Sequence, residues 1–274
     1  MAYYVGIDLH ATNSVVVVLD DEDRVLYQKR VRNELPPILT ALAPYRPTRH
    51  GIAVESTYNW YWLVDGLMEA GYGVHLAHAA ALPQSSGLKH ADDLPDARWL
   101  AHLLRLGLLP TGHIYPKIER ALRDLLRKRS QLVRHKTMVV LSLQSLLARL
   151  TGARFSLTRR QQLTPEAVTA LLPLPEHVLS VMSSLTVLRC LEGQIREVEQ
   201  AVRQQGRERP AYQLLQTVTG IGPTLALTIM LEAGDIRRFP TVGQFASYCR
   251  CVGSQHLSNG TRKGAGNTKN GNQY

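Results

Sequence analysis

Residues 1–19 constrain the fold of this chain more than any other stretch. A run of mostly aromatic and β-branched residues, Tyr3–Ile7, ends in Asp8, and a second apolar run, Ser14–Leu19, follows a short polar turn. Side chains of these types favour strands over helices, so the two runs predict a β-hairpin. An unpaired charge is costly within an apolar strand. Asp8 therefore needs a partner, either a metal ion or, as the more ordinary alternative, the backbone of the turn that it caps.

The pattern continues as a meander of strands and then alternates between strands and helices. A third strand, Val25–Val31, follows the polar turn at 20–23, and the next apolar run, Gly51–Glu55, also ends in a carboxylate. A fifth strand is expected at 74–77, and helices are expected at 36–43, 60–70 and 95–106. This order predicts the α/β class, with a mixed sheet and helices packed on it.

Two more carboxylates precede or open the next helix. Asp93 and Asp96 are three residues apart and so share one helix face. The helix dipole favours acidic groups there, which would explain both, although the adjacent Asp92 leaves the register open. The dipole does not explain why Asp8 and Glu55 end strands upstream. If the four converge, they need counter-charge, which two Mg²⁺ or Mn²⁺ ions held by oxygen ligands would supply.

The charge of the chain points to a polyanionic partner. Its formal net charge is +10 and its pI is near 9.7, which most simply suggests nucleic acid. Residues 118–150 form an amphipathic segment without Pro or Gly, and 176–205 resembles it, so a helical hairpin or coiled coil is predicted. The basic face of the first segment is as consistent with phosphate contact as with simple solvation; it includes Arg120, Arg123, Arg127 and Lys128.

The C-terminal part carries a second nucleic-acid motif. Residues 214–226 have the pattern of a helix–hairpin–helix, in which Gly220 and Gly222 would offer backbone N–H groups to a phosphate; a plain tight turn is the alternative. The tail at 253–274 is rich in Gly, Asn, Ser and Lys, and its cations are Arg262, Lys263 and Lys269. Because the chain ends at Tyr274 in mid-pattern, we expect the natural protein to continue.

Three features place the chain in a reducing, aqueous setting. Its three cysteines, Cys190, Cys249 and Cys251, form no metal-ligand spacing. Its apolar runs are shorter than the roughly 20 residues of a membrane span, and it opens directly on a strand without a secretory signal. We therefore expect a cytoplasmic protein with no membrane partner.

In combination and in order, these motifs resemble the DEDD transposases of the insertion-sequence 110 family. The resemblance covers nearly the whole chain, and its motifs are Tyr-Val-Gly-Ile-Asp8, Val-Glu55-Ser, Asp93-x-x-Asp96-Ala, Thr219-Gly-Ile-Gly-Pro and Gly234-Asp-Ile-Arg-Arg-Phe239. It implies an RNase H-like (RuvC-like) domain at 1–115, a coiled-coil segment at 116–208, and a mostly helical transposase domain with the helix–hairpin–helix at 209–274, truncated at its end.

The resemblance also implies an activity and its partners. It implies a recombinase that is guided by a structured RNA from its own element, acts on donor and target DNA as a dimer or tetramer, and associates with the nucleoid when active. It further implies a serine that attacks DNA near a Ser-x-Gly signature. Ser258 matches that signature best, and Ser254 is a second candidate. A serine needs activation, which the acidic site with its metal ions would supply.

Three other functions are weighed against this one. A RuvC-like Mg²⁺-dependent nuclease would cut structured DNA without a serine step, so Ser258→Ala would leave its cutting intact. A non-catalytic nucleic-acid-binding scaffold would use the carboxylates only as caps, and metal-dependent cleavage would exclude it. A sugar-kinase-like ATPase shares the first-strand motif but needs a later glycine-rich phosphate loop, which this sequence lacks.

Overall fold

The computed structural model describes residues 2–45, 51–82, 93–153, 163–252, 257–259, 261–262 and 271–274. The chain divides into two compact units, Met1–Tyr115 (unit 1) and Pro116–Tyr274 (unit 2), which are treated separately below.

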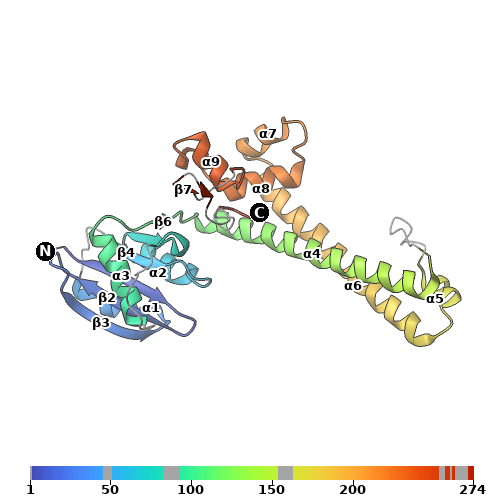
Figure 1. Ribbon diagram of the computed structural model, residues 1–274, viewed down its shortest axis with the longest axis horizontal. Helices are drawn as coiled ribbons and strands as arrows, with labels where there is room; N and C mark the ends of the chain where they lie inside the picture. The colour runs from blue at the N-terminus through green and yellow to red at the C-terminus, as the bar shows by residue number, and fades with distance from the viewer. Residues whose placement is uncertain are drawn as a thin grey trace. The chain divides into compact units, whose positions relative to one another are not determined.

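Unit 1 is an α/β domain built on a six-stranded mixed sheet (Figure 1). The strand order is β3-β2-β1-β4-β5-β6; β1, β4 and β5 run parallel, and the other pairings are antiparallel. The strands are β1 (Tyr4–Leu9), β2 (Asn13–Leu19), β3 (Val25–Arg32), β4 (Ile52–Glu55), β5 (Val74–Ala77) and β6 (Thr111–Gly112). The helices are α1 (Leu35–Leu42), η1 (Ala43–Tyr45), α2 (Tyr61–Glu69), η2 (Ala79–Ala81) and α3 (Asp93–Arg105).

The alternation of side chains along β1 separates the two faces of the sheet. Val5, Ile7 and Leu9 belong to the main core, together with buried residues of α1 and α2. Tyr4 lies on the opposite face, in a second cluster with Ala97 and Ala101 of α3. By the same alternation Gly6 and Asp8 lie on the face of the sheet that carries α3.

Unit 2 is helical, and its two long helices pack side by side (Figure 1). Its helices are α4 (Lys117–Thr151), α5 (Pro165–Leu171), α6 (Pro175–Gly206), α7 (Pro210–Gln216), α8 (Pro223–Ala233), η4 (Ile236–Arg238) and α9 (Val242–Tyr248), and its two short strands are β7 (Leu257–Ser258) and β8 (Thr261–Arg262). One apolar cluster lies between α4, α5 and α6, centred on Leu143, Leu147 and Leu185. A second, around Leu126, Val202 and Leu227, joins α4 and α6 to α8.

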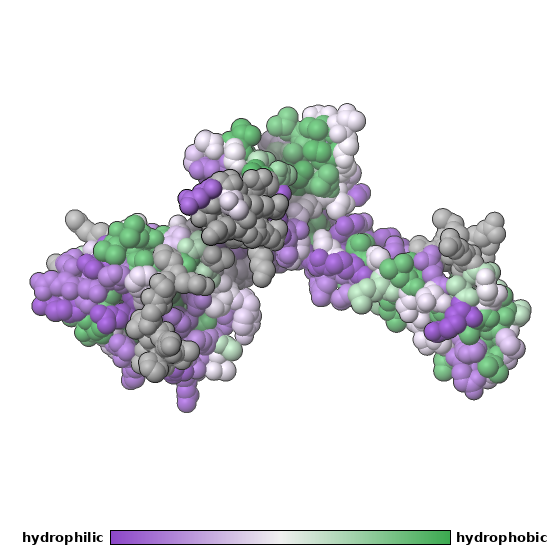
Figure 2. All heavy atoms as spheres, in the orientation of Figure 1, coloured by the Kyte–Doolittle hydropathy of each residue, from purple (hydrophilic) through white to green (hydrophobic). Residues whose placement is uncertain are grey.

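The surface of the α4–α6 hairpin mixes apolar and polar side chains (Figure 2). By length and composition alone, α6 would be able to cross a membrane. Two ion pairs nevertheless join it to α4, Arg129 to Glu199 at 2.7 Å and Lys136 to Glu192 at 3.2 Å. Charged groups are expensive inside a bilayer. These pairs favour α6 as one arm of a water-exposed hairpin.

The architecture fits the RNase H-like class predicted for the N-terminal part. The meander and the following alternation of strands and helices are present, and β6 is an added edge strand that the sequence pattern did not indicate. In unit 2, α7 and α8 contact each other across residues 217–222, as a helix–hairpin–helix would. The coiled-coil and helix–hairpin–helix assignments stay predictions.

Candidate active site

Two of the four predicted carboxylates meet at the ends of neighbouring parallel strands. The register pairs Ile7 of β1 with Val54 of β4, so the next residues, Asp8 and Glu55, lie side by side on the face that carries α3. Asp8 is 2% exposed, and its charge acts on Glu55. Strand alternation and parallel pairing are sufficient to bring these acids together.

The electrostatics of this pair are unfavourable for two negative charges. Burial, the hydrogen bond to Asp8, and the charges of Asp8 and Asp96 raise the pKa of Glu55 to about 7, against the opposing charge of His10. His10 itself places Nε2 at 2.9 Å from Oδ2 of Asp8. In the absence of a cation, Glu55 therefore retains a proton to near neutrality.

The loop that follows β1 is fixed by two amides. Asn33 and Asn59 both donate side-chain hydrogen bonds to the carbonyl oxygen of His10, at 2.8 and 3.0 Å. Ser14, buried in β2, donates in turn to Oδ1 of Asn33 at 2.6 Å. His10 and both amides were not predicted as part of the site, because their partners come from three different segments and no local pattern marks them.

Helix α3 brings the third acid to the site. Asp96 is exposed on α3, yet its charge contributes to the raised pKa of Glu55. The helix approaches β1 closely because residue 6 is glycine: a Cβ there would overlap the Ala97 carbonyl oxygen and lie 2.7 Å from the Ala101 nitrogen. Asp93 is the first residue of α3, but its side chain lies outside the described part of the structure, as does all of Asp92.

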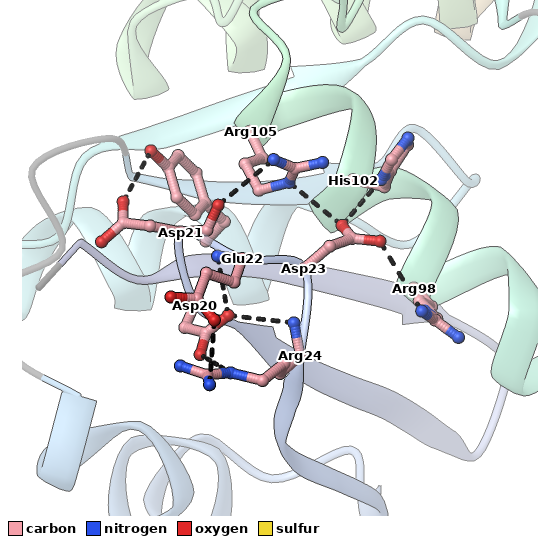
Figure 3. Close-up of polar contacts among 9 residues, drawn as sticks. Asp20, Asp21, Glu22, Asp23, Arg24, Arg98, His102 and Arg105 are labelled. Atoms are coloured by element: carbon pink, nitrogen blue, oxygen red, sulfur yellow. Dashed lines mark hydrogen bonds and ion pairs between the residues drawn. The ribbon is translucent and has the colours of Figure 1, made fainter.

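The turn between β2 and β3 anchors the other end of α3 (Figure 3). Oδ1 of Asp23 lies 2.7 Å from Nδ1 of His102 and accepts a hydrogen bond from Nε of Arg105 at 3.0 Å, and its Oδ2 is 3.6 Å from Nη2 of Arg98. Burial alone would raise the pKa of Asp23, but the hydrogen bonds and charges of His102 and Arg105 outweigh burial and lower it. Residues 20–23 were predicted as a polar turn only; in the structure Asp23 of this turn also holds α3.

The donor set suits a divalent cation. Carboxylate oxygens are hard ligands of the kind that Mg²⁺ and Mn²⁺ prefer, and a cation would replace the proton that Glu55 retains beside Asp8. Among the side chains that the structure describes, no three His, Cys, Asp or Glu groups form a ready-made metal cluster. Asp8 and Glu55 are thus the described pair around which a metal site would form.

The predicted basic face of α4 is partly wrong. Arg120 and Arg123 are only 3% and 7% exposed, so they do not lie on an open face. Arg120, Arg123 and Leu126 follow one another at intervals of three residues. Both arginines therefore lie on the side of α4 that carries the buried Leu126. Arg127 is half-buried and held by Glu232 of α8, with Nε to Oε1 at 2.6 Å and Nη2 to Oε2 at 2.7 Å. Only Lys128 of this predicted set is exposed.

The remaining predicted contacts lie at the glycine turn and in the tail. Gly220 is exposed with φ +92°, a left-handed conformation that suits glycine, and Gly222 is the N-cap of α8. Arg262 lies in β8, with its side chain outside the described atoms. Lys263, Lys269 and Ser254 lie outside the described residues altogether. The binding roles of these residues stay predictions.

Ser258 belongs to a hairpin rather than to an irregular loop. It pairs with Thr261 across the β7–β8 ladder, and Leu257 pairs with Arg262. Asn259 has φ +52°, and Asn-Gly between paired strand residues is the preferred sequence of a two-residue hairpin turn. Ser258 is therefore the last strand residue before the turn, although its side chain is not among those described.

Comparison with known proteins agrees with this geometry. The DEDD-type model of the insertion-sequence 110 family, described as transposase, matches residues 5–151, which is more than half of the chain. The chain belongs to the insertion-sequence 110 family of transposases. A second model, described as transposase of the IS116/IS110/IS902 family, matches residues 212–274. A relative from Pseudomonas aeruginosa, described as a probable family 20 transposase, is 27% identical over 98% of this chain and 80% of its own length.

Family membership decides the class of activity. This transposase is an enzyme that recombines DNA as part of a mobile insertion sequence, so the non-catalytic scaffold is set aside. A DEDD domain also implies dependence on divalent metal ions in general. The first model spans β1, β4 and α3, the elements that carry the four predicted acids.

Proposed function

We propose that this transposase cuts and rejoins donor and target DNA with the acidic cluster of unit 1 and the hydroxyl of Ser258. The observation that carries the first half is the Asp8–Glu55 pair, two acids at adjoining strand ends, where burial, Asp8 and Asp96 raise the pKa of Glu55 to about 7. A fold that needed only stability would gain little from two such acids, because each disfavours ionisation of the other.

The chain's own residues would prepare the acidic site for a metal. Asp8 and Glu55 would hold divalent ions, preferably Mg²⁺, together with Asp93 and Asp96. Such an ion supplies a charge that stabilises the attacking and leaving oxygens of a phosphoryl transfer. Gly6 allows α3 to approach the sheet, and Asp23 fixes the far end of that helix through His102 and Arg105.

The serine step exchanges one phosphodiester bond for another. Oγ of Ser258 forms a bond to the scissile phosphorus, while the bond from phosphorus to the leaving sugar oxygen breaks. The hydroxyl proton passes to a base, and the leaving oxygen takes up a proton. Rejoining reverses the exchange with a different DNA end. The Ser-x-Gly match supports Ser258, and so does its place beside a tight hairpin turn, where a phosphate can approach the backbone closely.

The partners follow from charge and from the family. A net charge of +10 supports binding of donor DNA, target DNA and a structured guide RNA, with an affinity that falls steeply as salt rises. Lys128, the glycine turn at Gly220 and Gly222, and the tail cations are the proposed contacts. The protein would act in the cytoplasm as a dimer or tetramer and associate with the nucleoid when active.

Trapping the protein on labelled DNA tests the mechanism. The proposal expects a covalent adduct at Ser258 that disappears in Ser258→Ala and also in Asp8→Asn. An adduct at Ser254 would reassign the nucleophile. Metal-dependent cutting that persists in Ser258→Ala would favour the second candidate function, a RuvC-like nuclease that works with the carboxylates alone.

A further inference from the structure

A buried carboxylate in unit 2, outside the acidic cluster, joins three segments of the chain. Glu232, at the end of α8, is 5% exposed. Its two oxygens accept the paired hydrogen bonds from Arg127 of α4, and Oε2 also accepts one from Nδ2 of Asn272 at 2.7 Å. Its backbone carbonyl accepts from the hydroxyl of Tyr248, at the end of α9, at 2.5 Å. None of the motifs in the sequence includes this group.

Tyr248 and Asn272 are also bonded directly to each other. Nδ2 of Asn272 donates to the Tyr248 hydroxyl at 2.8 Å, and its backbone nitrogen donates to the Tyr248 carbonyl at 2.7 Å. Arg250 adds two hydrogen bonds to the carbonyl of Gly271, at 3.1 and 3.2 Å. The chain thus leaves α9 and returns to the same place, although the two residues are 24 positions apart in sequence.

Gly271 shows how closely the segment 271–274 packs against the end of α9. It adopts φ +92°, and a Cβ on it would lie 2.7 Å from the Tyr248 carbonyl oxygen and 2.9 Å from that of Ser247. Beyond it, the ring of Tyr274 covers the Arg127 guanidinium at 4.4 Å. The segment that these contacts close contains the β7–β8 hairpin, and with it Ser258.

We infer that Glu232 is a positioning residue for the serine step: its carboxylate holds Asn272 and its backbone carbonyl holds Tyr248, which fastens both ends of the segment that carries Ser258 to the α4–α8 scaffold. This rests on the proposed role of Ser258. Closing a long segment costs entropy that grows with its length, and the bonds at Tyr248 and Asn272 offset that cost before DNA binds. Attack on phosphorus is sensitive to placement, since an error of about 1 Å can cost about a hundredfold in rate.

The test compares two neighbouring amides. Asn272→Ala removes the side chain that bridges the Glu232 carboxylate and the Tyr248 hydroxyl, whereas Gln273→Ala removes the adjacent exposed amide as a matched control. The measurement is the rate of Ser258–DNA adduct formation across a range of DNA concentrations, together with the melting temperature. Asn272→Ala should lower the maximal rate by about a hundredfold and leave the half-saturating DNA concentration unchanged. Gln273→Ala should match the wild type.

Each other outcome has a defined meaning. If Asn272→Ala does not fold, Tyr248→Phe, which keeps the ring and removes the hydroxyl, takes its place. Wild-type rates in either variant, with the adduct still on Ser258, would overturn the inference and leave the proposed function standing. A change confined to the half-saturating DNA concentration would overturn the positioning role and would assign the network to DNA binding. Recombination by the wild type without any Ser258 adduct would refute the proposed nucleophile, and the inference with it.

Discussion

Each unit withdraws a carboxylate at least partly from solvent, Glu232 almost completely and Glu55 to an intermediate degree, and the surroundings of the two are opposite. Glu232 of unit 2 is surrounded by donors, with a guanidinium on both oxygens and an amide on one. Glu55 of unit 1 faces Asp8 and Asp96, and its pKa rises to about 7. Burial of an acid is common to both sites, so burial does not identify chemistry. The charge of the neighbouring groups does identify it. An acid surrounded by hydrogen-bond donors, such as Glu232, stabilises the structure, whereas an acid crowded by other acids, such as Glu55, is suited to bind a cation.

The largest effect is expected at the crowded site. Asp8→Asn keeps the shape of the side chain but removes the charge, so recombination should fall by about a thousandfold, the upper range for losing a group that stabilises transition-state charge. Recombination of a labelled donor–target pair measures it. Glu69→Gln, an exposed acid of α2, serves as the control and should stay near wild type. A similar loss in that control would mean that general charge, rather than this site, controls activity.

At the satisfied site the expected effect is on stability. Glu232→Ala leaves Arg127 without its partner and should lower the free energy of unfolding by about 3 kcal/mol, near the bottom of the range for broken buried pairs because Arg127 is 32% exposed. Denaturant titration measures the loss. Replacing both partners with apolar residues, Arg127→Met with Glu232→Leu, should recover most of it. Failure of the double variant to recover would show that Asn272 and the Tyr274 ring depend on the charges themselves.

The two sites also differ in how pH affects stability, and the effect is set at the crowded site by Glu55. A folded-state pKa of about 7, raised from 4.5, favours the protonated form, so its stabilising contribution is complete below pH 4.5 and is lost as the pH rises to 7. With divalent ions removed, the free energy of unfolding of unit 1 should fall by about 2 kcal/mol over that window, less than the full shift would give because Glu55 is only partly buried and solvent screens its charge. Glu55→Gln should abolish the slope and stabilise the protein at pH 8. An unchanged slope would mean that Asp8 and Glu55 do not interact in solution.

The smallest effect is expected at the turn that anchors α3. Asp23→Asn weakens hydrogen bonds to His102 and Arg105 and should cost about 1–2 kcal/mol at pH 7. Because the pKa of Asp23 is lowered in the folded protein, its contribution is present above pH 3.8 and is lost as the pH falls through the folded-state value. Chemical denaturation of wild type and variant at pH 7 and pH 3 measures it. A cost that is equal at both values would indicate lost packing rather than lost charge.

The sequence by itself determined which acids can meet. Continuous apolar runs that end in an acid put Asp8 and Glu55 at the ends of strands, and a spacing of three put Asp93 and Asp96 on one helix face. These rules are local, because backbone geometry within a few residues fixes the direction in which each side chain points. The sequence predicted a mixed sheet without assigning the neighbours of each strand; the parallel pairing of β1 with β4, which brings Asp8 to Glu55, is a finding of the structure.

Only the tertiary structure decided what the cations and the unassigned acids do. Periodicity placed Arg123 on a basic face, yet the fold buries this side chain on the side of α4 that also carries Leu126. Glu232 hydrogen-bonds to Arg127, 105 residues away in the sequence, and to Asn272, 40 residues away. Asp23 contacts His102, which lies 79 residues further along the chain. Such partners are chosen by how helices pack against one another and against the sheet, and no local pattern in the chain records that choice.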